Sequence, residues 1–143
     1  MKRIVCMFLI VFVTAFSVVP VYAAQTKIPE EQNVVTPQFT YISSIIPSFK
    51  INSSGKSTSY GGASTYNSTH TIYVNIELQR YSGSNWSTIK SWSISGSGGN
   101  LVGTENDYYV TRGTYRICVT AKVYDAYSNL METQSIYSSA ITY

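Results

Sequence analysis

A cysteine and a histidine are the first residues to consider for chemistry, because thiol–imidazole pairs act as nucleophile and base in many hydrolases. Cys118 lies within RGTYRICVTAKVY, residues 112–124, and His70 lies within STYNSTHT, residues 64–71. His70 precedes a predicted strand, whereas Cys118 is in the middle of another, and neither context resembles that of a known cysteine hydrolase. We interpret the two as a loop histidine and a strand thiol.

Carboxylates offer a second kind of chemistry, because a glycosidase needs two of them about 5–9 Å apart. Glu77, on a predicted strand, is the best candidate for such a pair, but we interpret it as a cross-strand partner of Lys122 or Arg116. Glu105 and Asp107 are interpreted as solvated loop carboxylates. The sequence has neither enough histidine and cysteine for a structural zinc site nor the spacing of a calcium loop. We therefore expect no metal and no cofactor.

Tyrosine rings among polar residues give the positive signal for binding. Tyr73 and Tyr81 share the polar face of the predicted strand 71–81, and residues from the strand containing Cys118 join that face if the two strands are neighbours. Flat rings among amide and charged groups are typical of surfaces that bind sugars or peptides. The alternative is that tyrosine is simply a good strand former. The candidate surface, called the aromatic face below, comprises Tyr73, Asn75, Glu77, Tyr81, Trp86, Lys122 and Tyr124.

Two hydrophobic patterns of period two must position these residues. The segment TIYVNIELQRY, residues 71–81, alternates apolar and polar side chains, and residues 115–124 do the same. The loop SGSN then joins the first strand to WSTIKSWSIS, with an aromatic residue on each side of the loop. In this second strand Ile89 has the opposite parity to Trp92, which predicts either a bulge or an exposed aromatic side.

Weaker strands are predicted at 39–51, 56–66, 107–110 and 131–143, whereas the glycine-rich segment 95–107 is predicted to be a long loop. Pro47 places the first of these strands at a sheet edge or a strand break. With no helical periodicity, about seven strands predict an all-β fold, an immunoglobulin-like two-sheet antiparallel sandwich. A small barrel is the alternative.

The segment VTRGTYRI sharpens the sandwich prediction. In the immunoglobulin fold a tyrosine follows a tight corner at the start of the sixth strand, and its hydroxyl bonds to the backbone a few residues upstream. Gly113 and Tyr115 fit that corner, and Ile117 then occupies the position of the disulfide cysteine. Cys118 is one residue further on, which places it on the opposite, polar face.

The N-terminus has the pattern of a helical secretory signal peptide. Lys2 and Arg3 precede an apolar run from Ile4 to Val19, and small residues follow with predicted cleavage after Ala23. We divide the chain into a signal peptide (1–23), a flexible polar arm (24–37) and a β-sandwich domain (38–143). The expected location is extracellular, with no membrane attachment after cleavage.

Charge and cysteine content limit the partners of the cleaved chain. Loss of Lys2 and Arg3 leaves it nearly neutral, which argues against a nucleic acid partner. Cys118 then has no partner for an intramolecular disulfide, so an intermolecular one is possible if the thiol is exposed. A dimer through Cys118 is therefore one expectation to test.

The segments TPQFTYISSI, IELQRYSGSNWSTIKSWS, GTYRICVTAKVY and YSSAITY, together with the signal peptide, resemble a family of small secreted Firmicutes (clostridial) proteins of unknown function. The resemblance covers essentially the whole mature chain. It implies a Gram-positive, extracellular setting and supplies no activity or catalytic residue.

The sequence thus favours a secreted, non-catalytic β-sandwich that acts as a binding or surface-interaction module for a glycan or a protein, and not an enzyme. A small secreted hydrolase using Glu77 or Cys118 is one alternative. A secreted effector or inhibitor acting through the loop Ser95–Asp107 is another. The first predicts a flat aromatic surface without a deep pocket, the second predicts converging titratable groups, and the third predicts a projecting loop.

Overall fold

The two strands with the clearest alternation form the centre of the domain. In the computed structural model, which describes residues 38–143, the aliphatic side chains of 71–81 and 115–123 all face inward and are fully buried. The described residues belong to one compact unit. The predicted signal peptide and the whole of the predicted arm lie outside the described residues. The strands are β1 (Ile42–Ile51), β2 (Lys56–Thr65), β3 (Thr71–Tyr81), β4 (Trp86–Ser97), β5 (Val102–Tyr109), β6 (Thr114–Tyr124), β7 (Leu130–Tyr137) and β8 (Ile141–Thr142).

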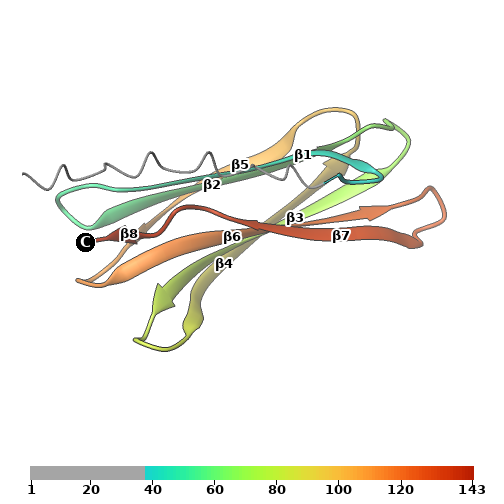
Figure 1. Cartoon of the computed structure of the whole chain (residues 1–143). Helices are drawn as coiled ribbons and strands as arrows, with labels where there is room; N and C mark the ends of the chain where they lie inside the picture. Colours follow the sequence, from blue (N-terminus) through green and yellow to red (C-terminus); the bar gives the residue numbers. More distant parts are fainter. Residues whose placement is uncertain (1–37) are drawn as a thin grey trace, which may run out of the picture. The chain divides into compact units, whose positions relative to one another are not determined.

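The strands form two antiparallel sheets that face each other (Figure 1). One sheet has the order β1-β2-β5, and the other has the order β4-β3-β6-β7 with the short β8 beside β6. This confirms the immunoglobulin-like sandwich and not the barrel. In the constant-type arrangement the fourth strand belongs to the first sheet. Here β4 pairs with β3, so the second sheet is the wider one and carries the aromatic face.

The core lies between the sheets, and β2 contributes smaller side chains to it than β3 and β6 do. The wall from β3 and β6 consists mostly of isoleucine, valine and leucine, whose burial stabilises the fold by about 1.5–3 kcal/mol per side chain. The facing wall of β2 consists of small residues, including Ser57, Ser59, Gly61 and Ala63. A Cβ on Gly61 would collide with the side chains of Ile76 and Val119. Small residues on β2 thus let the sheets approach closely.

The predicted tyrosine corner is present. Tyr115 is 1% exposed, and its hydroxyl donates a hydrogen bond to the carbonyl oxygen of Thr111 at 2.9 Å. Ile117 occupies the position of the disulfide cysteine and is fully buried. An aliphatic side chain thus fills the place that a disulfide takes in antibody domains.

A β-bulge explains why the inward and outward side chains of β4 do not alternate regularly. The β3–β4 register shifts opposite Leu78 and Gln79, and Ile89 is the extra residue of this bulge. Trp92 therefore packs against the core, whereas Trp86 pairs with Tyr81 on the outer side. The prediction for Pro47 is also confirmed, because β1 is an edge strand of its sheet.

The predicted long loop 95–107 is wrong. β4 continues to Ser97 and β5 begins at Val102, so residues 98–101 alone connect the two strands. The predicted strand 107–110 is accordingly too short. The glycines of this segment lie in or next to strands because space is short there: a Cβ on Gly96 would lie 2.8 Å from Val102 Cγ2, and one on Gly103 would lie 2.8 Å from the carbonyl oxygen of Gly61. A projecting loop for the effector alternative is therefore not found at this position.

Candidate functional site

The aromatic face occupies the outer side of the second sheet. β3 and β6 are neighbours, with Tyr73 opposite Lys122 and Asn75 opposite Thr120. Because alternate residues of a strand share a side, every predicted residue of this face projects away from the core. The face nevertheless has two separate ends. Tyr73 and Tyr81 lie roughly 26 Å apart along β3, at about 3.3 Å per residue.

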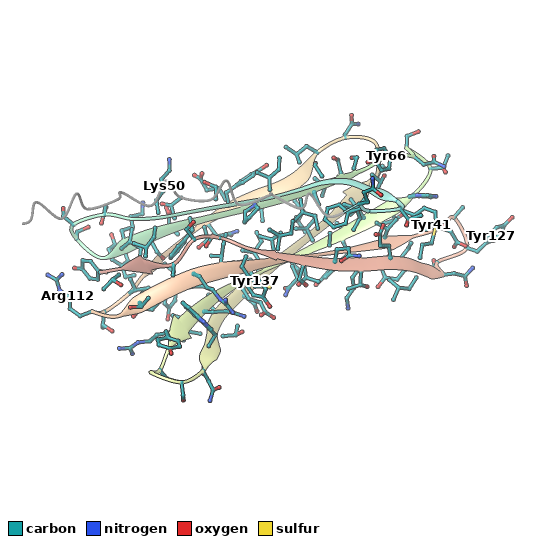
Figure 2. The ribbon with its side chains drawn as sticks, in the orientation of Figure 1. Tyr41, Lys50, Tyr66, Arg112, Tyr127 and Tyr137 are labelled. Carbon is teal, nitrogen blue, oxygen red and sulfur yellow. The ribbon has the colours of Figure 1, made fainter. Side chains whose placement is uncertain are left out.

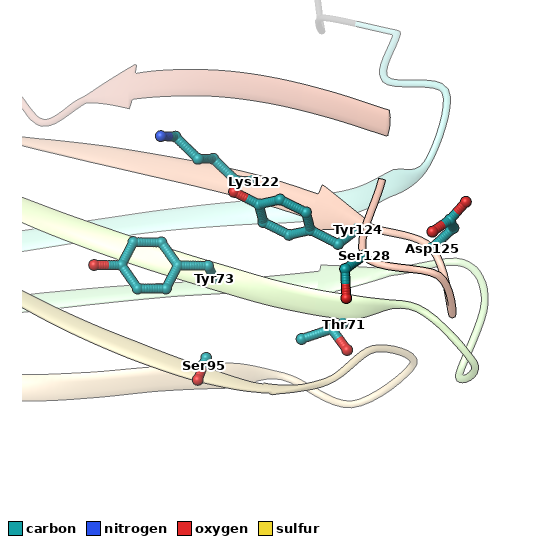
Figure 3. A pocket seen from close by; sticks show the side chains of 7 residues that line it. All are labelled: Thr71, Tyr73, Ser95, Lys122, Tyr124, Asp125 and Ser128. Carbon is teal, nitrogen blue, oxygen red and sulfur yellow. The ribbon is translucent and has the colours of Figure 1, made fainter. Parts of the chain in front are cut away.

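At one end of the aromatic face the surface is hollowed. The hollow has a volume of about 580 Å³, which is within the usual range for small-ligand sites. Figure 3 shows the rings of Tyr73 and Tyr124 and the stem of Lys122 along its floor. We call this feature the tyrosine hollow; it is lined by Thr71, Tyr73, Ser95, Lys122, Tyr124, Asp125 and Ser128. The predicted flat surface is thus concave at this end.

The turn between β6 and β7 closes one side of the tyrosine hollow. Asp125 Oδ1 accepts hydrogen bonds from the backbone N–H groups of Tyr127 and Asn129, both at 2.8 Å, and Oδ2 accepts one from Asn129 Nδ2 at 2.9 Å. The side-chain hydrogen bond from Asn129 is the main reason why the pKa of Asp125 lies below its ordinary value. Ser128 has a φ of 65°, which turns the chain back towards β7. Figure 2 shows Tyr127 projecting from the tip of this turn.

At the opposite end of the aromatic face from the tyrosine hollow, two aromatic rings pack against the guanidinium group of Arg116. Arg116 Cζ lies 4.2 Å from the ring centroid of Trp86 and 4.0 Å from that of Tyr137 (Tyr137 is labelled in Figure 2). Arg116 Nε also donates a hydrogen bond to Gln79 Oε1 at 3.0 Å. Tyr81 packs against Trp86 with ring centroids 5.2 Å apart. These contacts cover ring surface that a ligand would need.

Glu77 lies between the two ends and is held by neutral groups. Its carboxylate accepts hydrogen bonds from Asn75 Nδ2 at 3.3 Å, Gln79 Nε2 at 3.2 Å and Thr88 Oγ1 at 3.1 Å. Its cross-strand neighbours are Cys118 on β6 and Ser91 on β4. The predicted pairing of Glu77 with Lys122 or Arg116 is therefore wrong. Side-chain parity gave its face correctly, but the strand register decides its partners.

Cys118 and His70 do not meet. Cys118 projects from the middle of β6 on the outer face, as its parity predicts, but it is only 5% exposed. Thr71 lies opposite Tyr124 and Glu77 opposite Cys118, so His70 is about 23 Å from Cys118 along the sheet, at about 3.3 Å per residue. The ring of His70 instead packs edge-on against Tyr41 at 5.7 Å. A thiol–imidazole pair is thus not assembled by these two residues.

The sequence prediction missed four residues of the tyrosine hollow: Thr71, Ser95, Asp125 and Ser128. Thr71 shares the parity of Tyr73, so the alternation along β3 contained a signal for it. Ser95 reaches the hollow because it pairs with Tyr73 across the β3–β4 register. Asp125 and Ser128 come from a turn whose position over the sheet has no signature in local sequence.

Comparisons with known proteins do not assign this chain to a family. A scan against models of protein families finds no match, and a search of curated proteins finds no relative. Within residues 38–143 there is no helix long and apolar enough to cross a membrane. The same residues hold no group of three or more histidine, cysteine, aspartate or glutamate side chains placed to bind a metal ion. The candidate site is therefore defined by the residues and geometry described above.

Proposed function

We propose that this protein is a secreted, non-catalytic binding module that acts outside a Gram-positive cell and holds a glycan in the tyrosine hollow. The observation that carries the proposal is the placement of two tyrosine rings in one concavity with the hydroxyl groups of Thr71, Ser95 and Ser128. Aromatic rings pack against the apolar side of a sugar, while hydroxyl groups exchange hydrogen bonds with its edges.

The shape of the site favours a glycan over a protein surface. A standard protein interface buries about 800 Å² on each partner and is broadly flat. The tyrosine hollow is instead a local depression of about 580 Å³, a volume that suits one or two sugar rings. The signal-peptide pattern and the resemblance to small secreted Firmicutes proteins support the extracellular setting.

A glycan and cell-wall binding array with the fragment 24–143 tests the proposal. We expect Tyr73→Ala and Tyr124→Ala to weaken binding about tenfold each, the effect of losing about 1.4 kcal/mol of contact energy. Tyr81→Ala, on the same strand but outside the hollow, and Tyr109→Ala, on β5 of the other sheet, are matched controls that should bind normally.

Two results would contradict the proposal. One is the absence of binding by the parent fragment to any glycan or wall polymer on the array. The other is equal binding by the parent and the Tyr73 and Tyr124 variants, which would place the ligand elsewhere. A binding loss confined to Tyr81→Ala would assign the ligand to the end near Trp86 instead.

A further inference from the structure

Lys122 is the cationic residue of the tyrosine hollow. It lies on β6 directly opposite Tyr73, and its own strand places Tyr124 on the same side. On the other flank its neighbour across the β6–β7 register is Thr133, a neutral residue. The residue is half-buried, with its aliphatic stem lining the hollow beside the two rings.

This ammonium group has no protein counterion. In the part of the chain that the structure describes, the one ion pair joins Lys56 and Asp107, which belong to the other sheet. Arg116, the other cation on this outer face, is already engaged by Gln79 and two aromatic rings. Glu77 is four residues from Tyr73 along β3, about 13 Å from the row that contains Lys122. The outer face therefore leaves the charge of Lys122 unneutralised.

Asp125 does not supply the missing counterion. Its two carboxylate oxygens together accept three hydrogen bonds from the β6–β7 turn. Figure 3 shows the carboxylate directed away from the two tyrosine rings. The carboxylate thus fixes the turn at the margin of the hollow, while Lys122 of the same lining takes part in no ion pair within residues 38–143.

We infer that the tyrosine hollow selects sugars that carry an anionic group, a carboxylate or a phosphate, and that Lys122 pairs with that group. This inference rests on the proposed function and names the class of glycan. The rings of Tyr73 and Tyr124 contact the sugar ring, and Lys122 forms a charge-assisted hydrogen bond with its anionic substituent. Ligand binding then provides the counterion that the fold lacks.

The experiment compares matched sugars by calorimetry with the purified protein. The probes are a galacturonic acid tetramer, the same tetramer after reduction of its carboxyl groups to alcohols, and a mannose 6-phosphate oligosaccharide with its dephosphorylated form. We expect each anionic probe to bind at least tenfold more tightly than its neutral match. Lys122→Gln should remove this difference and Lys122→Arg should keep it, while Lys90→Gln, the same charge change on β4, should have no effect.

The outcomes separate this inference from the proposed function. Equal binding of anionic and neutral probes, or an unchanged preference in Lys122→Gln, would overturn the role of Lys122 while leaving a glycan module intact. Binding of neither anionic probe would also overturn it, and the array would then judge the proposed function separately. A tenfold preference in only one of the two pairs, lost in Lys122→Gln, would still support the inference and would identify carboxylate or phosphate as the group recognised.

Discussion

At the residue scale, the hydroxyl of Tyr115 shows how one polar atom fixes a corner of the fold. It is buried with the ring and has a single hydrogen-bond acceptor, the carbonyl oxygen of Thr111. A buried hydroxyl that finds no partner costs free energy, so this bond holds the segment before β6 in one conformation.

Tyr115→Phe should therefore lower the free energy of unfolding by about 1–2 kcal/mol, because the hydrogen bond is lost while the ring remains. Urea denaturation followed by circular dichroism measures the change. Tyr109→Phe, at a ring that is 71% exposed, is the control and should stay within about 0.5 kcal/mol of the parent. An equal effect of the two substitutions would contradict a structural role for the corner.

Cys118 should be unreactive while the protein is folded, because its thiol is 5% exposed between β3 and β7. We expect a thiol reagent to label it only after addition of urea, and a non-reducing gel to show no disulfide-linked dimer. Ser93→Cys in a Cys118→Ser background, at an exposed position of the same face, is the control and should react at once. Equally fast labelling of the native thiol would contradict its burial and support the prediction of a dimer through Cys118.

At the element scale, Glu132 joins the two sheets. It lies on β7, and its carboxylate accepts hydrogen bonds from the backbone N–H groups of Thr40, Tyr41 and Ile42 at 3.2, 2.7 and 3.0 Å. Burial would raise the pKa of Glu132, but the three backbone donors together hold its pKa below the ordinary value of 4.5. The start of β1 is thus anchored on a charge from the opposite sheet.

A lowered pKa makes the contribution of Glu132 depend on pH. The folded state favours the ionised carboxylate, so the stabilisation is complete above the ordinary pKa of 4.5 and is lost as pH falls through the lower pKa of the folded state. Glu132→Gln should reduce the free energy of unfolding by about 1–2 kcal/mol at pH 7, since partial exposure weakens the bonds. This difference should shrink towards pH 3. Denaturation at both pH values measures it, and a difference independent of pH would contradict the anchoring role.

How far the elements could be predicted from the sequence depended on their periodicity. β3 was predicted with its observed bounds because residues 71–81 alternate without interruption. β5 was mostly missed because Gly103, which lies too close to the backbone of β2 for a side chain, and the glycines just before the strand look like loop residues. Parity also gave the face of Cys118, but its burial depends on neighbours such as Tyr137 that only the β6–β7 register brings together.

In the candidate site, too, strand periodicity predicted some residues, whereas the features that depend on the three-dimensional arrangement could not be predicted. Tyr73, Lys122 and Tyr124 were predicted because each follows from strand parity. The concavity could not be predicted, since it requires the β6–β7 turn to close one side and Ser95 to be brought in from β4. The packing at the Trp86 end of the aromatic face could not be predicted either, because it depends on Arg116 lying between Trp86 and Tyr137.

At the scale of the whole molecule, one core shared by both sheets replaces a disulfide. β1 contributes Ile42, Ile45 and Phe49, and the opposite sheet contributes the buried faces of β3 and β6, in which Ile117 stands at the disulfide position. Since neither sheet can bury its inner face without the other, they should unfold together.

We therefore expect a single unfolding transition that reducing agent leaves unchanged. Trp86 and Trp92 both lie on the edge strand β4, so tryptophan fluorescence reports on that strand, while circular dichroism reports on all strands. Because Trp92 packs against the shared core, the two signals should change at the same urea concentration. A fluorescence change at lower urea would mean that β4 separates before the core unfolds, and a lower midpoint in reductant would mean that a disulfide contributes to stability.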